Sequence, residues 1–117
     1  MRRPATIRIR AQLYEEAVQI IEDHYAGDLE LEEIARRIAT SPRQLQRAFA
    51  EQGDTTFRER LTAVRMKRAA ELLANPALTI REVANRVGYC QAAQFAKAFR
   101  RHHGIVPSAY RVQRLQM

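Results

Sequence analysis

The sequence predicts an all-α protein that contains two copies of a helix-turn-helix. Apolar residues recur with helical spacing along most of the chain. Alternation at period two is missing, and only 4 glycines occur in 117 residues. Short helical segments also return at an offset of about 50 residues. Two copies are too few for a solenoid, so we interpret the repeat as a duplicated helix-turn-helix.

A first helix is expected from about residue 11, followed by a second helix over Leu31–Ile38. One face of the first helix carries Leu13, Ala17, Ile20, Ile21 and His24, and His24 is expected to be partly buried. Ser41 has the features of an N-cap, because Pro42 follows it and Gln44 completes a capping box. The helix after Ser41 buries Leu45, Ala48 and Phe49 and should end near Gly53.

A long helix is predicted next, capped by Thr55 or Thr56 and ended by Asn75-Pro76. Its apolar stripe consists of Phe57, Leu61, Val64, Leu72 and Leu73. From Thr56 to Asn75 it spans about 20 residues, or ~30 Å at 1.5 Å per residue. Successive major grooves on one face of DNA lie ~34 Å apart, so such a helix could hold two reading helices one helical turn apart.

The repeat then begins, with a capping box formed by Thr79 and Glu82. Each copy joins two helices by a three-residue turn. The matched segments are Leu31–Ile38 with Ile80–Val87, Ala39–Ser41 with Gly88–Cys90, Leu45–Phe49 with Phe95–Phe99, Gly53 with Gly104, and Thr56-Phe57 with Pro107-Ser108. The predicted organisation is a basic N-terminal arm over 1–10, a first helix-turn-helix subdomain over 11–54, a linker helix over 55–75 and a second subdomain over 76–115.

The charge distribution favours a polyanionic partner. The net charge is +7, yet residues 1–33 hold 4 Arg against 8 acidic residues, whereas residues 34–117 hold 16 Lys and Arg against 5. A basic surface that serves only solubility is the alternative. The arginines of the N-terminal arm could follow a phosphate backbone or belong to a disordered tail without a role. They are Arg2, Arg3, Arg8 and Arg10.

In a helix-turn-helix, the second helix enters the major groove and its outer side chains reach base edges. In the first copy these are Arg43, Gln46 and Arg47, whose side chains suit guanine and adenine. In the second copy the exposed positions include alanines, which cannot make bidentate contacts, so this half is expected to contribute less sequence choice. The predicted base-reading residues of that copy are Gln91, Ala92, Ala93, Ala96 and Lys97. Predicted phosphate contacts are Arg100, Arg101, His102, Ser41 and Thr55.

These segments resemble the signature of the AraC/XylS family of transcription regulators. The resemblance covers roughly residues 11–112, in the runs Arg65–Leu73, Ile80–Ala84, Val87–Tyr89, Phe95–Arg101 and Pro107–Arg111. It implies a seven-helix, bilobal fold whose fourth helix links the two halves. It also implies a cytoplasmic bacterial regulator that binds promoter DNA as a monomer and acts, as an activator, on RNA polymerase. Family members often have Gly at Ala39 and Ser at Cys90.

Two alternatives to this function remain open at this point. The chain could be the DNA-binding fragment of a larger effector-responsive regulator, or a helical adaptor that binds an acidic protein. An enzyme is not expected, because no glycine-rich phosphate loop, paired carboxylates or Ser/His/Asp grouping occurs. The few aromatic residues fall at core positions, which disfavours RNA binding. The sequence indicates no cofactor, membrane span or small-molecule site.

Three isolated features have a simpler interpretation beside a functional one. Cys90 could be a thiol switch near a helix start, although a small residue in place of Ser at a cap is the simpler interpretation. His102 and His103 are adjacent and diverge on a helix, so a metal site is not expected. Arg111 and Arg114 are expected to cap the last helix through its dipole.

Overall fold

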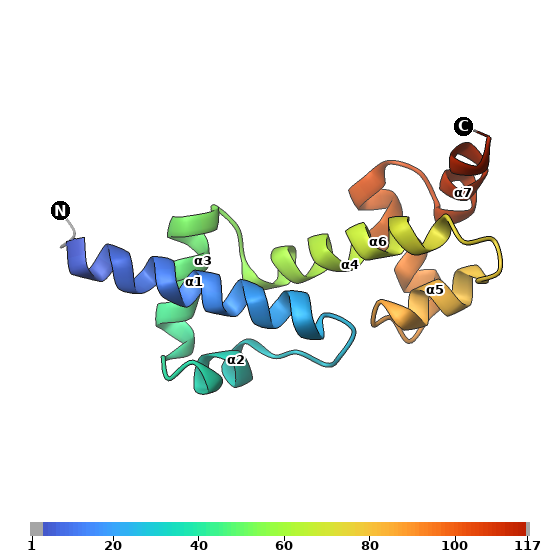
Figure 1. Ribbon diagram of the computed structural model, residues 1–117. Coiled ribbons are helices and arrows are strands. Elements are labelled where there is room, and N and C mark those ends of the chain that lie inside the picture. The colour runs from blue at the N-terminus through green and yellow to red at the C-terminus, as the bar shows by residue number, and fades with distance from the viewer. Residues whose placement is uncertain (1–3, 117) are drawn as a thin grey trace. The chain divides into compact units, whose positions relative to one another are not determined.

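The computed structural model describes residues 4–116, and this range contains seven α-helices and no strand (Figure 1). The helices are α1 (Pro4–His24), α2 (Leu31–Arg37), α3 (Pro42–Gly53), α4 (Phe57–Leu73), α5 (Ile80–Arg86), α6 (Ala92–His103) and α7 (Pro107–Leu115). This is the all-α, seven-helix fold that the sequence and its resemblance predict. The chain divides between Leu61 and Thr62 into two compact units, and the division lies inside α4.

The first unit is built on the packing of α1 against α3, with α2 against both. Its fully buried side chains include Ala17, Ile21, Ile34, Leu45 and Phe49. His24 is exposed, so the prediction that it is partly buried is wrong. His24 lies seven residues after the buried Ala17 and so on the same side of α1, but it is the last residue of the helix.

The N-terminal arm predicted over residues 1–10 is not an arm where the structure describes it. Residues 4–10 form the first turns of α1, and Arg10 is only 7% exposed. Its guanidinium Nη1 lies 2.6 Å from Oε1 of Glu51 on α3. A partly buried ion pair therefore ties the start of α1 to α3, which the local sequence does not reveal. Arg2 and Arg3 lie outside the described residues.

The second unit packs α5 on α6 and α6 on α7, together with the last three turns of α4. Phe95 and Phe99 of α6 are fully buried, as are Val83 and Ala84 of α5. On α4, the predicted stripe omits Met66 and Ala69, which are both fully buried. Thus α4 contributes apolar side chains to the second unit as well as Leu61 to the first.

The helix boundaries place the repeat in a constant register from α3 onward. Pro42–Gly53 and Ala92–His103 have equal lengths and begin 50 residues apart. Asp54 and Gly104, the two left-handed C-cap residues, are also 50 apart. The matches of Gly53 with Gly104 and of Thr56-Phe57 with Pro107-Ser108 were therefore shifted by one residue. Phe57 corresponds to Pro107, since each begins its helix.

Candidate nucleic-acid interface

Local hydrogen bonds set the start of α3. The Ser41 hydroxyl oxygen accepts from the backbone N–H of Gln44 at 3.1 Å, and Pro42 occupies the first turn. Gln44 does not return a bond to Ser41, because its Oε1 accepts from Nη2 of Arg10 at 3.5 Å. The predicted N-cap is confirmed, whereas the capping box is half formed. Because the Ser41 oxygen acts here as an acceptor, its O–H can still donate to another group.

The outward face of α3 combines three polar side chains at helical spacing. Arg43, Gln46 and Arg47 are exposed, while Leu45 and Phe49 are fully buried on the other side. Neither arginine has an ion-pair or hydrogen-bond partner among residues 4–116. Their guanidinium groups are therefore available for an external acceptor, and such groups can bind guanine or phosphate.

The orientation of this face is set by contacts that α3 makes with α1. The Tyr14 ring meets the Phe49 ring edge-on, with centroids 5.4 Å apart. Arg10 contacts Gln44 and Glu51, which lie seven residues apart and so on the same side of α3. Two turns of the helix are thus held by one buried guanidinium. We expect this to limit rotation of α3 about its own axis.

A hollow of about 420 Å³ lies beside Gln46 in the first unit. Thr55, at the start of α4, also lines it, as does Arg58, which the sequence analysis did not single out. The Thr55 hydroxyl donates to Oε2 of Glu59 at 3.2 Å, so it would have to rotate to donate to a phosphate. Arg58 is an exposed cation at this rim, and only its tertiary position beside Gln46 marks it as a candidate contact.

The second reading helix, α6, differs at the corresponding positions. At the constant offset of 50, Ala93, Ala96 and Lys97 correspond to Arg43, Gln46 and Arg47. Ala93 and Lys97 are exposed, whereas Ala92 and Ala96 are half-buried. Gln91 is the N-cap, but its side chain makes no capping hydrogen bond and is exposed. One cation and one amide are therefore the polar groups among the five predicted reading residues.

The predicted phosphate contacts of α6 lie on different sides of the helix. Arg100 and Arg101 are exposed and have no ion-pair partner in the described part of the chain. His102 follows Ala93 by nine residues, or about two and a half turns, which places it on the opposite side of α6. It lines a groove with α4 and α7 instead. This placement separates His102 from the reading face.

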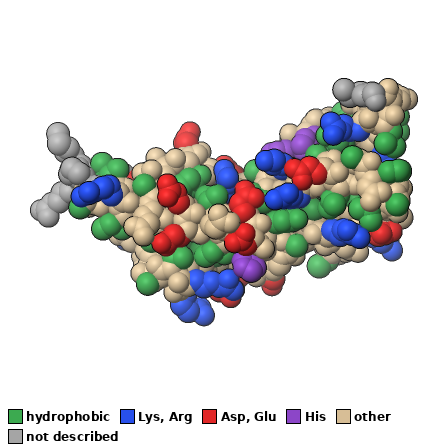
Figure 2. Space-filling model, viewed as in Figure 1, with side chains coloured by type: hydrophobic (Ala, Val, Ile, Leu, Met, Phe, Trp, Pro, Cys, Tyr) green, Lys and Arg blue, Asp and Glu red, His purple; other side chains and the backbone are tan. Residues whose placement is uncertain are grey.

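The space-filling view shows where charges gather on one face of the molecule (Figure 2). Acidic side chains cluster over α1, in agreement with the acidic balance of residues 1–33. The cations of the reading helices belong to the basic remainder of the chain. In each unit one reading helix, α3 or α6, has a buried apolar side and an exposed side with cations that have no ion-pair partner among the described residues. This arrangement is suited to an anionic, grooved partner such as duplex DNA.

Comparison with known proteins decides the family. The family model described as a helix-turn-helix domain matches residues 34–113. The chain belongs to the AraC family. It is 36% identical over 93 residues to the Msm operon regulatory protein of Streptococcus mutans, a match that covers 80% of this chain and 34% of that protein.

Solved structures with the same fold support the assignment. The C-terminal domain of AraT, a response regulator from Geobacillus stearothermophilus, matches with a TM-score of 0.83 and 37% identity, over 86% of this chain and 84% of that chain. The DNA-binding domain of AdpA, solved with a target DNA, matches with a TM-score of 0.77 and 28% identity, over 86% and 90% of the two chains. The chain spans about a third of the length of the curated relatives it matches. It corresponds to the DNA-binding domain of an AraC-family regulator, and this family consists of transcription regulators rather than enzymes.

Three further features of this AraC-family domain concern Cys90, metal ions and membrane spans. Cys90 is exposed, but Gln91 rather than Cys90 caps α6, so Cys90 does not replace a capping Ser. Within the described range, no three His, Cys, Asp or Glu side chains come together to hold a metal ion. No described helix is long and apolar enough to span a membrane.

Proposed function

We propose that the chain reads duplex DNA chiefly through the exposed face of α3. The observation that carries this proposal is the combination of Arg43, Gln46 and Arg47 on one helical stripe, without intramolecular ion pairs, opposite a fully buried face. Arginine pairs with guanine and glutamine with adenine through two hydrogen bonds each, and such contacts contribute about 1–3 kcal/mol of discrimination. The second helix, α6, then contributes fewer base contacts through Gln91, Ala92, Ala93, Ala96 and Lys97.

Phosphate contacts complete this proposal and orient the two helices. We assign them to Arg100 and Arg101 after α6, and to Ser41 and Thr55 at the helix starts of the first unit. Arg58 joins them because it lines the same hollow as Thr55. His102 is left out, because it lies on the opposite side of α6 from Ala93. These contacts carry no sequence information, but each one makes binding more dependent on salt.

We also propose that one chain engages two successive major grooves without dimerising. The duplicated helix-turn-helix provides two reading helices, and α4 has residues in both units. At 17 residues it is about 25 Å long, somewhat shorter than the sequence predicts. Activation of transcription through contact with RNA polymerase is a further expectation, which the family resemblance supports. An effector domain outside this chain is compatible with the length of the relatives.

The test begins with selection of bound sequences from a random duplex pool at near-physiological salt. One asymmetric motif is expected, with a sharply defined half and a vaguer half about 10 base pairs away. A 1:1 complex in sedimentation would support binding as a monomer. A symmetric motif or a 2:1 complex would contradict it. Purely salt-sensitive binding without any motif would contradict sequence reading by α3.

Two arginine variants separate base reading from phosphate contact. Arg47→Ala should weaken binding to the selected site by about 1–3 kcal/mol and relax the preference at one base. Arg101→Ala removes the same charge but should weaken binding to all sequences alike and make the salt dependence shallower. If the base preference is unchanged in Arg47→Ala, this arginine does not read a base.

A further inference from the structure

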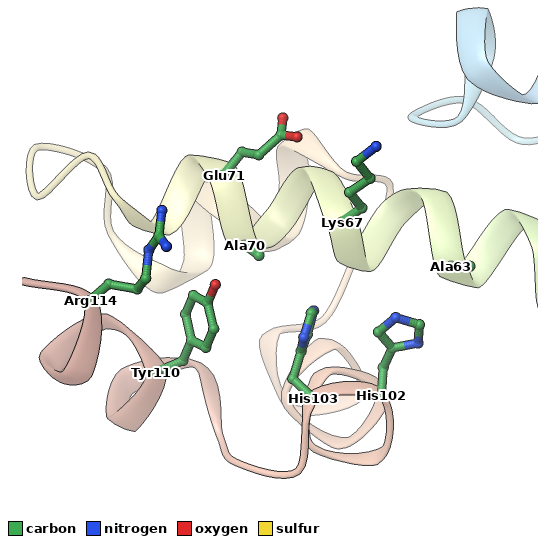
Figure 3. Close-up of a pocket in the computed structure, with 8 residues that line it drawn as sticks. All are labelled: Ala63, Lys67, Ala70, Glu71, His102, His103, Tyr110 and Arg114. Atoms are coloured by element: carbon green, nitrogen blue, oxygen red, sulfur yellow. The ribbon is translucent and has the colours of Figure 1, made fainter. Parts of the chain in front are cut away.

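The second unit contains a groove on the side of α6 that faces away from Ala93. It lies between α4 and the α6–α7 segment and has a volume of about 470 Å³ (Figure 3). His102 lines the groove at the end of α6, on the side opposite Ala93 of the reading face. Volumes of this size are typical of small-molecule sites. The groove is therefore available as a second, separate binding surface.

One wall of the groove is a cluster of rings that pack edge-on or tilted against one another. The ring centroid of Tyr110 lies 5.3 Å from that of the buried Phe99. The ring centroid of His103 lies 4.3 Å from that of Phe99. Nε2 of His103 donates to the backbone carbonyl of Met66 at 3.2 Å, which fixes the plane of the imidazole. Because these rings are held by the core, a ligand would not have to order them on binding.

The opposite wall is formed by small side chains of α4. Ala63 and Ala70 lie seven residues apart and so on the same side of the helix, facing His102, His103 and Tyr110 (Figure 3). Both are half-buried. A larger side chain at either position would fill the space between α4 and the rings. The two walls together suit a flat, apolar body that stacks against aromatic faces.

The charges at the rim favour a negatively charged ligand. Lys67 and Arg114 both line the groove, and neither has an ion-pair partner among the described residues. Glu71, the acidic residue at this rim, lies 3.2 Å from Nη1 of Arg68. Figure 3 shows the Arg114 guanidinium beside the hydroxyl of Tyr110. A guanidinium can bind a carboxylate through two parallel hydrogen bonds, with greater geometric selectivity than an ammonium group.

We propose that this groove binds a small organic anion with a flat apolar ring system and one carboxylate. The ring system stacks on Tyr110 and His103 against Ala70, and the carboxylate binds Arg114, with Lys67 adding to the attraction. Such a site has the general form of a ligand pocket, in which apolar walls bury the ligand and a few polar groups orient it. This inference is independent of how the chain reads DNA.

The test titrates 2-naphthoate into the unmodified chain. Two-dimensional NMR of the backbone amides follows the binding. Saturable shifts confined to residues 63–71 and 102–114 are expected, with a dissociation constant on the order of 1 mM or lower. The neutral 2-naphthamide should bind at least about tenfold more weakly, because it cannot pair with Arg114. Shifts scattered over the chain, no saturation, or equal binding of the amide would overturn the proposal.

Two variants of groove residues and one matched control locate the site. Ala70→Leu should abolish the binding by filling the groove, and Arg114→Gln should weaken it about tenfold. Arg81→Gln removes the same charge from an exposed position on α5 and should leave the binding unchanged. The amide spectrum of each variant shows whether it is folded. If Ala70→Leu is misfolded, Ala63→Leu provides the second blocking variant. A folded blocking variant that still binds 2-naphthoate would contradict the assignment.

Discussion

Arg111 donates from Nε to the backbone carbonyl of Leu73, at 3.1 Å, across 38 residues of sequence. Its Nη2 donates to the carbonyl of Asn75 at 3.3 Å. The last carbonyls of α4 have no partner within their own helix, and a cation near them also interacts favourably with the helix dipole. Arg111 therefore caps the C-terminus of α4 and not that of its own helix α7. The prediction that Arg111 caps the last helix is wrong, because α7 docks with this residue against the end of α4.

We expect Arg111→Met to lower the free energy of unfolding by about 1–2 kcal/mol, since charge-assisted hydrogen bonds are lost at the end of α4. Urea unfolding followed by circular dichroism measures this change. Faster amide exchange should appear around Leu73. Arg114→Met removes the same charge from the same helix, and it should leave the stability nearly unchanged because Arg114 makes no such bond. Equal effects of the two variants would show that charge, and not capping, is responsible.

Gly53 lies against Tyr14, and the contact leaves no room for a side chain. A Cβ at position 53 would clash with the hydroxyl oxygen of Tyr14 and would lie 2.7 Å from the ring carbon that bears it. The Tyr14 ring also packs edge-on against Phe49, which limits its movement. Gly53→Ala should therefore destabilise the protein by about 1–3 kcal/mol, as overpacking does.

Thermal or urea unfolding of Gly53→Ala is best compared with Gly27→Ala. A Cβ at Gly27 would meet its nearest atom at 3.4 Å, so this control should be close to neutral. Combining Gly53→Ala with Tyr14→Ala should cost less than the two single changes added together, since the clash is removed. Strict additivity would contradict the proposed contact.

Each helix-turn-helix turn contains one residue in the left-handed conformation, and this residue differs between the two turns. Ala39 has φ of 56°, and its counterpart Gly88 has φ of 98°. A left-handed conformation costs a residue with a Cβ roughly 1–2 kcal/mol. Replacing that residue with glycine removes this cost, but the gain is reduced because glycine loses more conformational entropy on folding. Ala39→Gly should thus stabilise the first unit by up to about 1 kcal/mol.

The reciprocal change, Gly88→Ala, should destabilise the protein by about 1–2 kcal/mol or more. Strain at this φ is increased by the guanidinium of Arg65, which would lie 3.0 Å from the added Cβ. Denaturant midpoints of both variants check this pair of predictions. Ala39→Gly should keep its DNA preference, because the turn geometry is unchanged. A destabilised Ala39→Gly variant would show that Ala39 is not strained.

His102 provides a prediction on pH. Burial, and secondarily the positive charge of His103, lower the pKa of His102 below the ordinary value of 6.5. The unfolded chain therefore binds a proton at higher pH than the folded chain does, and stability falls as the pH drops below about 6.5 toward the lowered pKa. Above this window both states are neutral and the effect vanishes.

Urea midpoints measured between about pH 7.5 and pH 5 should show a smaller loss of stability on acidification in His102→Gln than in the parent chain. The acidic, basic and histidine side chains that line the same groove as His102 are Lys67, Glu71, His103 and Arg114. The effect should be small, because the groove removes only part of the His102 side chain from solvent and the residue as a whole is exposed. A loss of stability that is the same in both proteins would show that His102 does not contribute to it.

Most of the helix pattern and of the first reading face could be predicted from the sequence. Capping residues such as Ser41 and Thr79 act on N–H groups three residues away, so their bonds can be inferred locally. The burial of Leu45 and Phe49 on one side of α3 predicts which side chains on the other side are exposed, namely Arg43, Gln46 and Arg47. These predictions need only the period of the α-helix and the chemistry of side chains. The repeat and its resemblance to the AraC family needed no coordinates either.

Tertiary structure decided the features that depend on contacts distant in sequence. The local sequence predicts a basic arm that includes Arg10, yet the structure buries Arg10 beside Glu51, which lies 41 residues later in the chain. Arg111 caps a helix that ends 38 residues earlier. The groove around Tyr110 exists because α4 presents alanines where α6 and α7 present rings. Periodicity determines which side of a helix is apolar, but only packing determines which partner that side meets, and those partners decide where a buried charge or an open groove is stable.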